Sequence, residues 1–269
     1  MNTIKFILKR ILIAIPVLIG VMLIIFLMLN VVPGDPVTLM MKEHIKPELI
    51  ERMRVEMGLN DPVMVRFFNY IKNAAHGDFG VSYKLNRNVT DLILNAFPHT
   101  VRLTIFAALI AWIIGIPAGI ISAVKQNSLI DRFLMSFSLI GVSMPVFWMG
   151  LLLVIVFMPA IVLGWSSAGT IARLTRSSLL EIMKDDYVRT ARAKGLKENG
   201  VVVGHALKNA LLPVVTMMAI QIASLLSGAV ITESVFGIPG IGRLAGNAIQ
   251  TRDMPLLQGS VMFMTVIVI

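Results

Sequence analysis

Long apolar runs alternate with charged segments along this chain, and the alternation predicts helices that cross a membrane. Residues 11–34 and 133–172 carry no charge at all, and further apolar runs lie at about residues 98–123, 210–231 and 255–269. A helix rises about 1.5 Å per residue, so about 20 apolar residues cross a hydrocarbon core about 30 Å thick. Because residues 133–172 have basic residues on both sides, that run should hold two crossings. The pattern therefore predicts about six transmembrane helices.

The charges between these runs predict which side each segment faces. Three basic residues lie between residues 5 and 10, ahead of the first run, and place the N-terminus in the cytoplasm by the positive-inside tendency. Residues 33–97 carry eight basic and eight acidic residues, a balance that suits the outer side. Residues 173–208 carry eight basic and four acidic residues, so this segment should face the cytoplasm.

The outer segment between the first and second spans predicts a small helical subdomain. One helix should open near Pro47, and another should be capped by Asp61, begin at Pro62 and end at Gly77. We therefore expect residues 1–97 to form the first transmembrane helix and an extracytoplasmic subdomain. Residues 98–269 should form the transmembrane core.

Two features predict that segments of the natural protein are missing. Two spans use all 40 residues of the charge-free run and leave nothing for the outer turn near Phe157 and Met158. An outer loop is therefore expected to be missing near 157–158. The chain also stops at Ile269 inside an apolar run, so we expect the C-terminal end to continue.

Composition excludes a soluble globular enzyme. Hydrophobic residues make up 57% of the 269 residues and charged residues 14%, against about 45–50% and about 25% in ordinary soluble domains. The chain has no cysteine, and its spans carry almost no ionisable residue that could couple transport to protons. The sequence shows no nucleophile motif, phosphate-binding glycine loop or metal-binding histidine pair. We therefore predict no enzyme activity, no metal site and an energy source in a partner protein.

The most informative segment lies in the basic loop. Residues 186–196 read DYVRTARAKGL, and residues 205–213 read HALKNALLP. The pattern predicts a short cytoplasmic helix, a break at Gly195 and a second helix that leads into the fifth span. Small side chains at Ala191 and Ala193 would let another protein approach the backbone. The alternative interpretation is an ordinary basic loop that only sets topology.

This segment resembles the EAA loop of ABC importer permeases, in the form shared by the dipeptide, oligopeptide and nickel subfamily. Three other segments are similar to the B-type subunit of that subfamily: PGDP at 33–36, HGDFGVS at 76–82 and TESVFGIPGIGR at 232–243. The resemblance implies an all-α polytopic membrane protein with the type I ABC importer transmembrane fold. It covers essentially the whole chain.

The resemblance also implies function and partners. Such a subunit imports di- to oligopeptides by alternating access. It pairs with a second related permease subunit as a heterodimer and rests on two cytoplasmic ATPase subunits, which bind ATP and Mg²⁺, so this chain needs no cofactor of its own. An extracytoplasmic solute-binding protein delivers the substrate. The implied location is the cytoplasmic (inner) membrane of a bacterium or archaeon, and no nucleic acid is involved.

The resemblance and the residue types suggest three groups of site residues. The coupling contact to the ATPase would be formed by Arg189, Thr190, Ala191, Arg192, Ala193, Lys194, Gly195 and Leu196. The translocation path would be lined by Ser136, Ser143, Thr216, Gln221, Ser224 and Ser227, for which helix packing is the competing interpretation. The outer gate or binding-protein contact would use Glu233, Gly237, Pro239, Gly240 and Arg243, and Glu233 could pair with Arg102 or Arg252.

Two alternatives remain open from the sequence. The first keeps the class and changes the cargo to nickel or a metal chelate, because the same motifs occur in those permeases. The second is a membrane scaffold that docks a cytoplasmic protein without transport.

Overall fold

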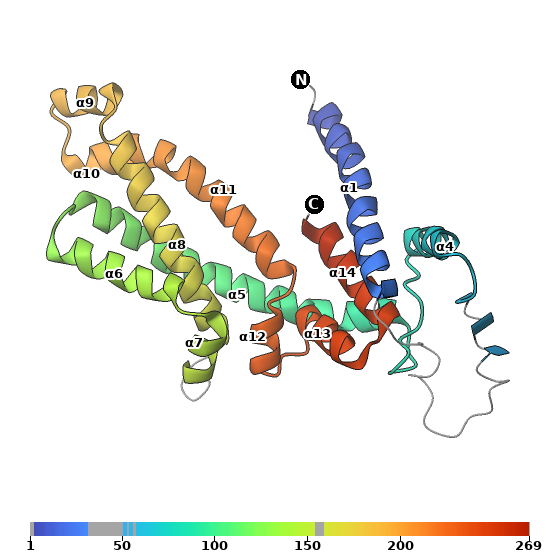
Figure 1. Ribbon diagram of the computed structural model, residues 1–269. Helices are drawn as coiled ribbons and strands as arrows, with labels where there is room; N and C mark the ends of the chain where they lie inside the picture. Colours follow the sequence, from blue (N-terminus) through green and yellow to red (C-terminus); the bar gives the residue numbers. More distant parts are fainter. Residues whose placement is uncertain (1–2, 32–50, 53, 56–57, 154–158, 269) are drawn as a thin grey trace. The chain divides into compact units, whose positions relative to one another are not determined.

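The computed structural model is mostly helical (Figure 1), and it describes residues 3–31, 51–52, 54–55, 58–153 and 159–268. Contacts divide the chain into two units, one formed by Met1–His99 with Pro239–Ile269 and the other by Thr100–Ile238. The expected domain boundary at 97/98 lies close to the break at 99/100. The expected core, however, included residues 239–269, which the contacts place with the N-terminal unit.

The first unit contains α1 (Thr3–Val31), α4 (Val63–Ala75), α13 (Ile241–Thr251), α14 (Met254–Val268) and the first turns of α5 (Val89–Val124). Helix α1 packs on α14 and on α4, where the Phe26 and Phe67 rings meet edge to face at 5.5 Å. A second cluster packs the start of α5 against α13 and α14, and this cluster explains why the last helices belong to this unit. Its buried members are Val89, Leu92, Ile93, Ala96, Ile241, Ala248 and Leu256.

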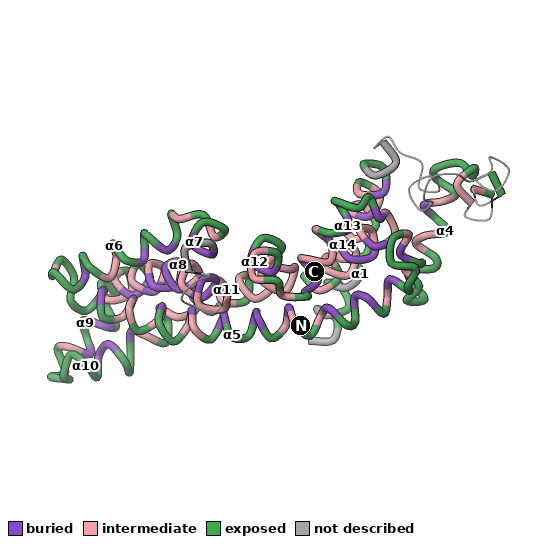
Figure 2. The backbone as a smooth tube through the Cα atoms, turned by 90° about the horizontal axis from the view of Figure 1, so that it is seen from below, coloured by how far each residue is buried: buried purple, intermediate pink, exposed green. Residues whose placement is uncertain are grey.

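The second unit is built around one central helix, α8. Helices α6, α7, α11 and α12 all pack against α8, and Figure 2 shows buried residues along it. The elements of this unit, besides the rest of α5, are α6 (Leu129–Ser143), α7 (Val146–Leu153), α8 (Pro159–Ile182), α9 (Asp186–Ala193), α10 (Glu198–Val201), the π-helical turn η1 (Val202–Ala206), α11 (Leu207–Leu226) and α12 (Val230–Val235).

Glycines let α8 lie very close to its neighbours. A Cβ atom added to Gly119 of α5 would lie 2.5 Å from the carbonyl oxygen of Ala172, and one added to Gly169 of α8 would lie 2.5 Å from the carbonyl oxygen of Ser138 in α6. Gly115 and Gly119 are four residues apart, so both face α8. Small residues at this spacing are a common means of close helix packing in membranes, where the hydrophobic effect does not drive helices together.

The predicted spans correspond to observed helices, with different ends. Helix α5 begins at Val89, nine residues before the predicted start at Pro98, and α1 already includes the basic residues ahead of the apolar run. The predicted third span is two helices, because Pro145 cannot donate a backbone hydrogen bond and the chain breaks between α6 and α7. The expected missing loop near 157–158 lies outside the described residues.

Length and composition make three described helices able to cross a membrane, Leu8–Met28, Val89–Val124 and Glu198–Leu226, and Met254–Val268 is a shorter apolar helix. Helix α8 continues past the charge-free run to Ile182 and so carries Arg173 and Arg176.

The predicted helix after Pro62 is confirmed as α4, and Gly77 follows it with a φ of +80°, which favours glycine. Its predicted cap is wrong: Pro62 holds the cap position, and no side chain caps the helix, because the Asp61 carboxylate lies one residue too early. The predicted helix near Pro47 lies outside the described residues.

Candidate functional site

The cytoplasmic segment predicted to couple to a partner forms the expected helix, glycine break and second helix. Helix α9 ends at Ala193, Gly195 follows with a φ of +77°, and α10, η1 and α11 then continue without interruption. In Figure 1, α9 lies at the end of α8, where the chain turns back toward α11. A φ of +77° lies in the left-handed region, which glycine adopts without the steric cost of a Cβ atom, so the reversal favours glycine here.

Helix α9 has one face buried within this chain and one face exposed. Val188 and Ala191 are 0% and 5% exposed, because they pack into a cluster with the C-terminal ends of α5 and α8 and the start of α11. The other buried members of this cluster, which we call the α9 cluster, are Ala123, Leu179, Val201, Val202, Ala206 and Ala210. The exposed residues of the segment are Asp186, Tyr187, Arg189, Thr190, Ala193, Lys194, Gly195 and Leu196.

The burial of Ala191 changes the reason for its small size. The sequence suggested that a small side chain there admits a partner protein, but in the structure Ala191 faces the chain's own helices. Ala193 is exposed, as the predicted approach of a partner protein to the backbone requires. The structure therefore leaves seven of the eight predicted coupling residues at least partly on the surface, Arg192 being half-buried.

Arg192 holds the turn around Gly195 in place. Its guanidinium donates to both carboxylate oxygens of Glu198, at 3.1 and 2.7 Å, and to the carbonyl oxygen of Met183 at 3.2 Å. Arg192 thus links the end of α8 to the start of α10, whereas Arg189 is exposed and has only an i,i+3 pair with Asp186 at 3.6 Å.

We predict that Ala191→Leu and Ala193→Leu have different effects. A leucine at 191 would overfill the α9 cluster, which typically costs about 1–3 kcal/mol, so the thermal unfolding temperature of the purified protein should fall. A leucine at 193 adds volume only on the surface and should leave that temperature unchanged. Equal unfolding temperatures for the two variants would contradict the buried position of Ala191.

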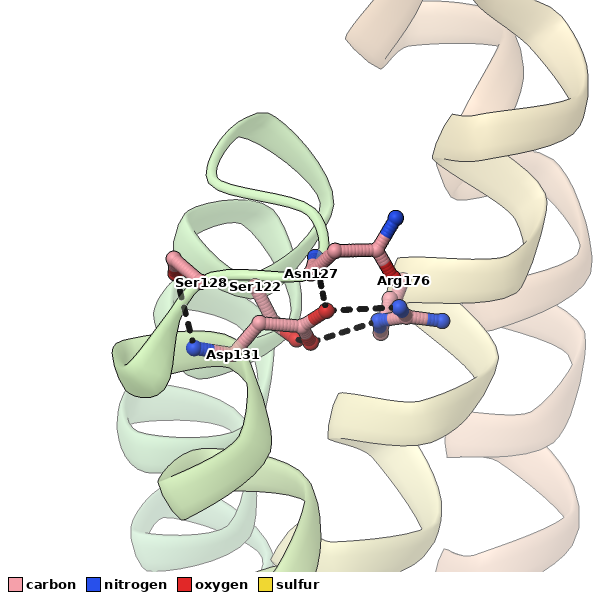
Figure 3. A network of polar contacts seen from close by, with 5 residues as sticks. All are labelled: Ser122, Asn127, Ser128, Asp131 and Arg176. Atoms are coloured by element: carbon pink, nitrogen blue, oxygen red, sulfur yellow. Dashed lines mark hydrogen bonds and ion pairs between the residues drawn. The ribbon is translucent and has the colours of Figure 1, made fainter.

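An ion pair that the sequence did not suggest joins a buried carboxylate to a partly exposed guanidinium (Figure 3). Asp131, in the first turn of α6, accepts hydrogen bonds from Nε and Nη2 of Arg176 in α8 at 2.8 and 2.7 Å. It also accepts from the Ser122 hydroxyl at the end of α5 and from the Asn127 backbone at 2.9 Å. The only sequence signal was an aspartate beside an apolar run, and its partner lies 45 residues away.

The predicted path residues do not share one environment. Ser136, Ser143, Thr216 and Ser224 are exposed on α6 and α11. Gln221 instead turns toward α8, where its Nε2 donates to the Ser167 carbonyl oxygen at 3.2 Å, and Ser227 donates to the Ala223 carbonyl oxygen at 2.9 Å, within its own helix. The contact of Gln221 matches the packing interpretation, whereas the first four remain available to a path.

The predicted outer residues fall in both units. Glu233 of α12 is fully buried, and it accepts a 2.7 Å hydrogen bond from the Thr100 hydroxyl of α5. The suggested ion pair with Arg102 does not form, since Arg102 is exposed and the described residues give it no acidic partner. Gly237 has a φ of +69° and belongs with Glu233, whereas Pro239, Gly240 and Arg243 belong to the other unit.

Asp253 is a second buried carboxylate that sequence reasoning missed. It is 1% exposed and accepts hydrogen bonds from the Ser82 hydroxyl and from the backbone of Tyr83, Lys84 and Leu256. It therefore caps α14 and holds the turn that follows the predicted HGDFGVS motif. Among the described residues, no three His, Cys, Asp or Glu side chains gather where a metal ion could bind.

The fold matches that of a known ABC importer. The inward-facing MetNI methionine ABC transporter superposes with a TM-score of 0.58 at 20% identity, over 66% of this chain and 89% of that chain, and a second crystal form gives 0.59. The architecture is thus that of the membrane subunit of a type I ABC importer.

Comparison of the sequence assigns the family. Residues 115–269 match the family described as binding-protein-dependent transport system inner membrane component, and residues 3–104 match its N-terminal region. The chain belongs to this family and is a permease subunit of an ABC importer in the inner membrane. A family of this kind works with an ATPase and a solute-binding protein.

Two relatives match almost the whole chain. The dipeptide transport system permease protein DppB of Escherichia coli strain K12 is 35% identical over 98% of this chain and 93% of its own length. The glutathione transport system permease protein GsiC of the same strain is 39% identical over 96% and 90%. The DppB alignment spans 316 positions, so DppB contains residues without a counterpart in these 269. That such residues belong near 157–158 stays a prediction.

Proposed function

We propose that this chain is the permease subunit through which an ATP-driven importer moves peptides, from dipeptides to short oligopeptides, across the cytoplasmic membrane. The observation that carries the proposal is the match over nearly the whole chain to permeases of dipeptide and glutathione transport, glutathione being a tripeptide. Because both relatives are permeases of peptide transport, nickel is not favoured as the cargo. Because the chain belongs to a family of transport proteins, a membrane scaffold without transport is not favoured either.

The proposed complex contains a second, related permease subunit, two ATPase subunits and an external binding protein. The ATPase subunits bind ATP and Mg²⁺ and perform hydrolysis, and this chain contributes no catalytic residue. The N-terminus lies in the cytoplasm of a bacterium or archaeon, as the basic residues ahead of α1 suggest.

The exposed face of α9 is the proposed contact with the ATPase. Arg189 and Lys194 supply positive charge, and Tyr187 and Leu196 supply apolar surface that is 41% and 46% exposed. Such a surface fits a groove lined by carboxylates and apolar side chains. Because Val188 and Ala191 sit in the α9 cluster, a displacement of α9 reaches the ends of α5, α8 and α11 and can shift the protein between inward-open and outward-open states.

The proposed path is neutral and hydroxyl-lined. Ser136, Ser143, Thr216 and Ser224 would face it, with the partner subunit supplying the other half. Such a lining offers peptide groups hydrogen bonds without a strong charge that would trap one cargo. For the gate or the contact with the binding protein, Gly237 is the candidate in the second unit, and Pro239, Gly240 and Arg243 are separate candidates in the first unit. Glu233 is fully buried, so its role would be to hold α12 against α5.

The test is uptake of a mixed pool of di- to hexapeptides, read by mass spectrometry, in cells with and without this subunit. Nickel with a chelator is supplied in parallel. We expect loss of peptide uptake without the subunit and no change in nickel. Loss of nickel uptake alone would reassign the cargo, and unchanged uptake of both would contradict a transport role.

A further inference from the structure

The ion pair in Figure 3 joins α5, α6 and α8. Asp131 begins α6, Ser122 and Asn127 lie in the last turn of α5 and the loop after it, and Arg176 lies in α8. The side chain of Asp131 is 4% exposed, and its carboxylate accepts four hydrogen bonds. A buried carboxylate that is satisfied in this way fixes its surroundings, because losing one partner leaves an uncompensated charge.

The ion pair and the α9 cluster use neighbouring residues at the same ends of α5 and α8. Ser122 precedes Ala123, a member of the cluster, and Arg176 lies one helical turn before Leu179, another member. Helix α6 itself contributes no residue to the cluster. Asp131 is therefore the polar connection between α6 and the helices that α9 touches.

We propose that Asp131 and Arg176 are positioning residues for coupling, which make the start of α6 move with α5, α8 and α9 as one rigid body. The inference rests on the proposed transport function and extends it. Without the ion pair, α9 would still dock on the ATPase and still move the ends of α5 and α8. The motion would reach α6 and α7 only through their uncharged packing on α8, which includes the close contacts at Gly169 and Gly141 and the stacked rings of Phe137 and Trp165.

The variant that tests this is Asp131→Asn, which keeps the shape and removes the charge. Its matched control is Arg132→Gln, because Arg132 is the next residue, is exposed, and has a side chain without a hydrogen-bond or ion-pair partner among the described residues. In proteoliposomes containing the complete transporter, we expect Asp131→Asn to hydrolyse ATP but to spend about tenfold more ATP per peptide imported. Arg132→Gln should match the unmodified protein. Arg176→Lys, which keeps the charge and loses the paired geometry, should lie between them.

A distance measurement separates coupling from mere stability and does not depend on the cargo. The chain has no cysteine, so Leu129→Cys on α6 and Asp186→Cys on α9 give two unique sites for spin labels, 129 being 81% exposed. We expect one narrow distance with and without ATP in the unmodified background, and a broadened distance that changes with ATP when Asp131→Asn is added.

A narrow, unchanged distance together with a normal ratio of ATP to peptide in Asp131→Asn would overturn the inference. The inference would also be overturned if Asp131→Asn failed to assemble while Arg176→Lys coupled normally. In that case the ion pair would have a structural role only. If the unmodified transporter imports no peptide, the proposed function fails, and the distance measurement still decides whether α6 and α9 move together.

Discussion

Replacing Gly195 with proline is expected to abolish peptide uptake while the transporter still inserts, assembles and hydrolyses ATP. Proline holds φ near −65°, whereas Gly195 has a φ of +77° and its N–H donates to the Arg192 carbonyl oxygen at 2.9 Å. The turn after α9 would therefore take another path, and Lys194 and Leu196 would leave their positions. Uptake and ATP hydrolysis measured on one preparation of proteoliposomes would show this loss of coupling.

A matched pair of alanine substitutions isolates the backbone from the side chain. Gly195 and Gly200 are both exposed, and a Cβ atom at either position meets nothing within 4 Å, but only Gly195 has a positive φ. Gly195→Ala should strain the turn by about 1–2 kcal/mol and reduce uptake, whereas Gly200→Ala should leave uptake unchanged. Equal uptake by the two alanine variants would contradict a role for the left-handed turn.

Replacing Gly119 with leucine is expected to disrupt the second unit. Its first added atom would lie 2.5 Å from the Ala172 carbonyl oxygen and 2.6 Å from the Thr175 Cβ atom, so α5 and α8 would have to separate. Overpacking a tight contact costs about 1–3 kcal/mol for modest insertions and more for larger ones. Because α6, α7, α11 and α12 also pack on α8, we expect the yield of folded protein and its thermal unfolding temperature to fall sharply.

The control is Gly20→Leu in α1, where a Cβ atom meets nothing within 4 Å. Size-exclusion chromatography in detergent and a thermal unfolding scan should find this variant close to the unmodified protein. A Gly119→Leu variant as stable as Gly20→Leu would show that α5 and α8 do not pack as closely as described.

Sequence patterning predicted the helices well because membrane crossing imposes a length and a composition that can be counted. The charge-free runs located α1, and the sequence predicts the break at Gly195 after a short helix. The break at Pro145 was not predicted, because the division of that run was expected near residues 157–158. Helix ends were less accurate. Residues 89–97 looked polar enough for the outer segment, yet Val89, Ile93 and Ala96 pack on α13 and α14 and extend α5 by nine residues.

The sequence predicted which segment forms the candidate site, but it did not predict the direction in which each side chain of that segment points. Eight consecutive residues were assigned to the coupling contact, and only the packing of α9 shows that Ala191 turns inward and that Arg192 is held by Glu198 and Met183. Likewise, Gln221 was expected in the path and turns to the backbone of α8. Side chains point away from a helix in every direction, so which of them are buried depends on the elements that pack around the helix.

By itself the sequence determined the class of protein, the approximate spans, the basic loop that holds the candidate coupling segment and the glycine at which the chain reverses. These follow from local properties: apolar length, charge and the φ angles that a residue can adopt. Only the tertiary structure decided that Asp131 pairs with Arg176, that Asp253 caps α14 and that Gly119 meets Ala172. The first and third contacts join residues far apart along the chain, and Asp253 also accepts hydrogen bonds from Ser82, Tyr83 and Lys84, 169 to 171 residues away. A buried charged group needs a partner, and a close helix contact leaves no room for a side chain.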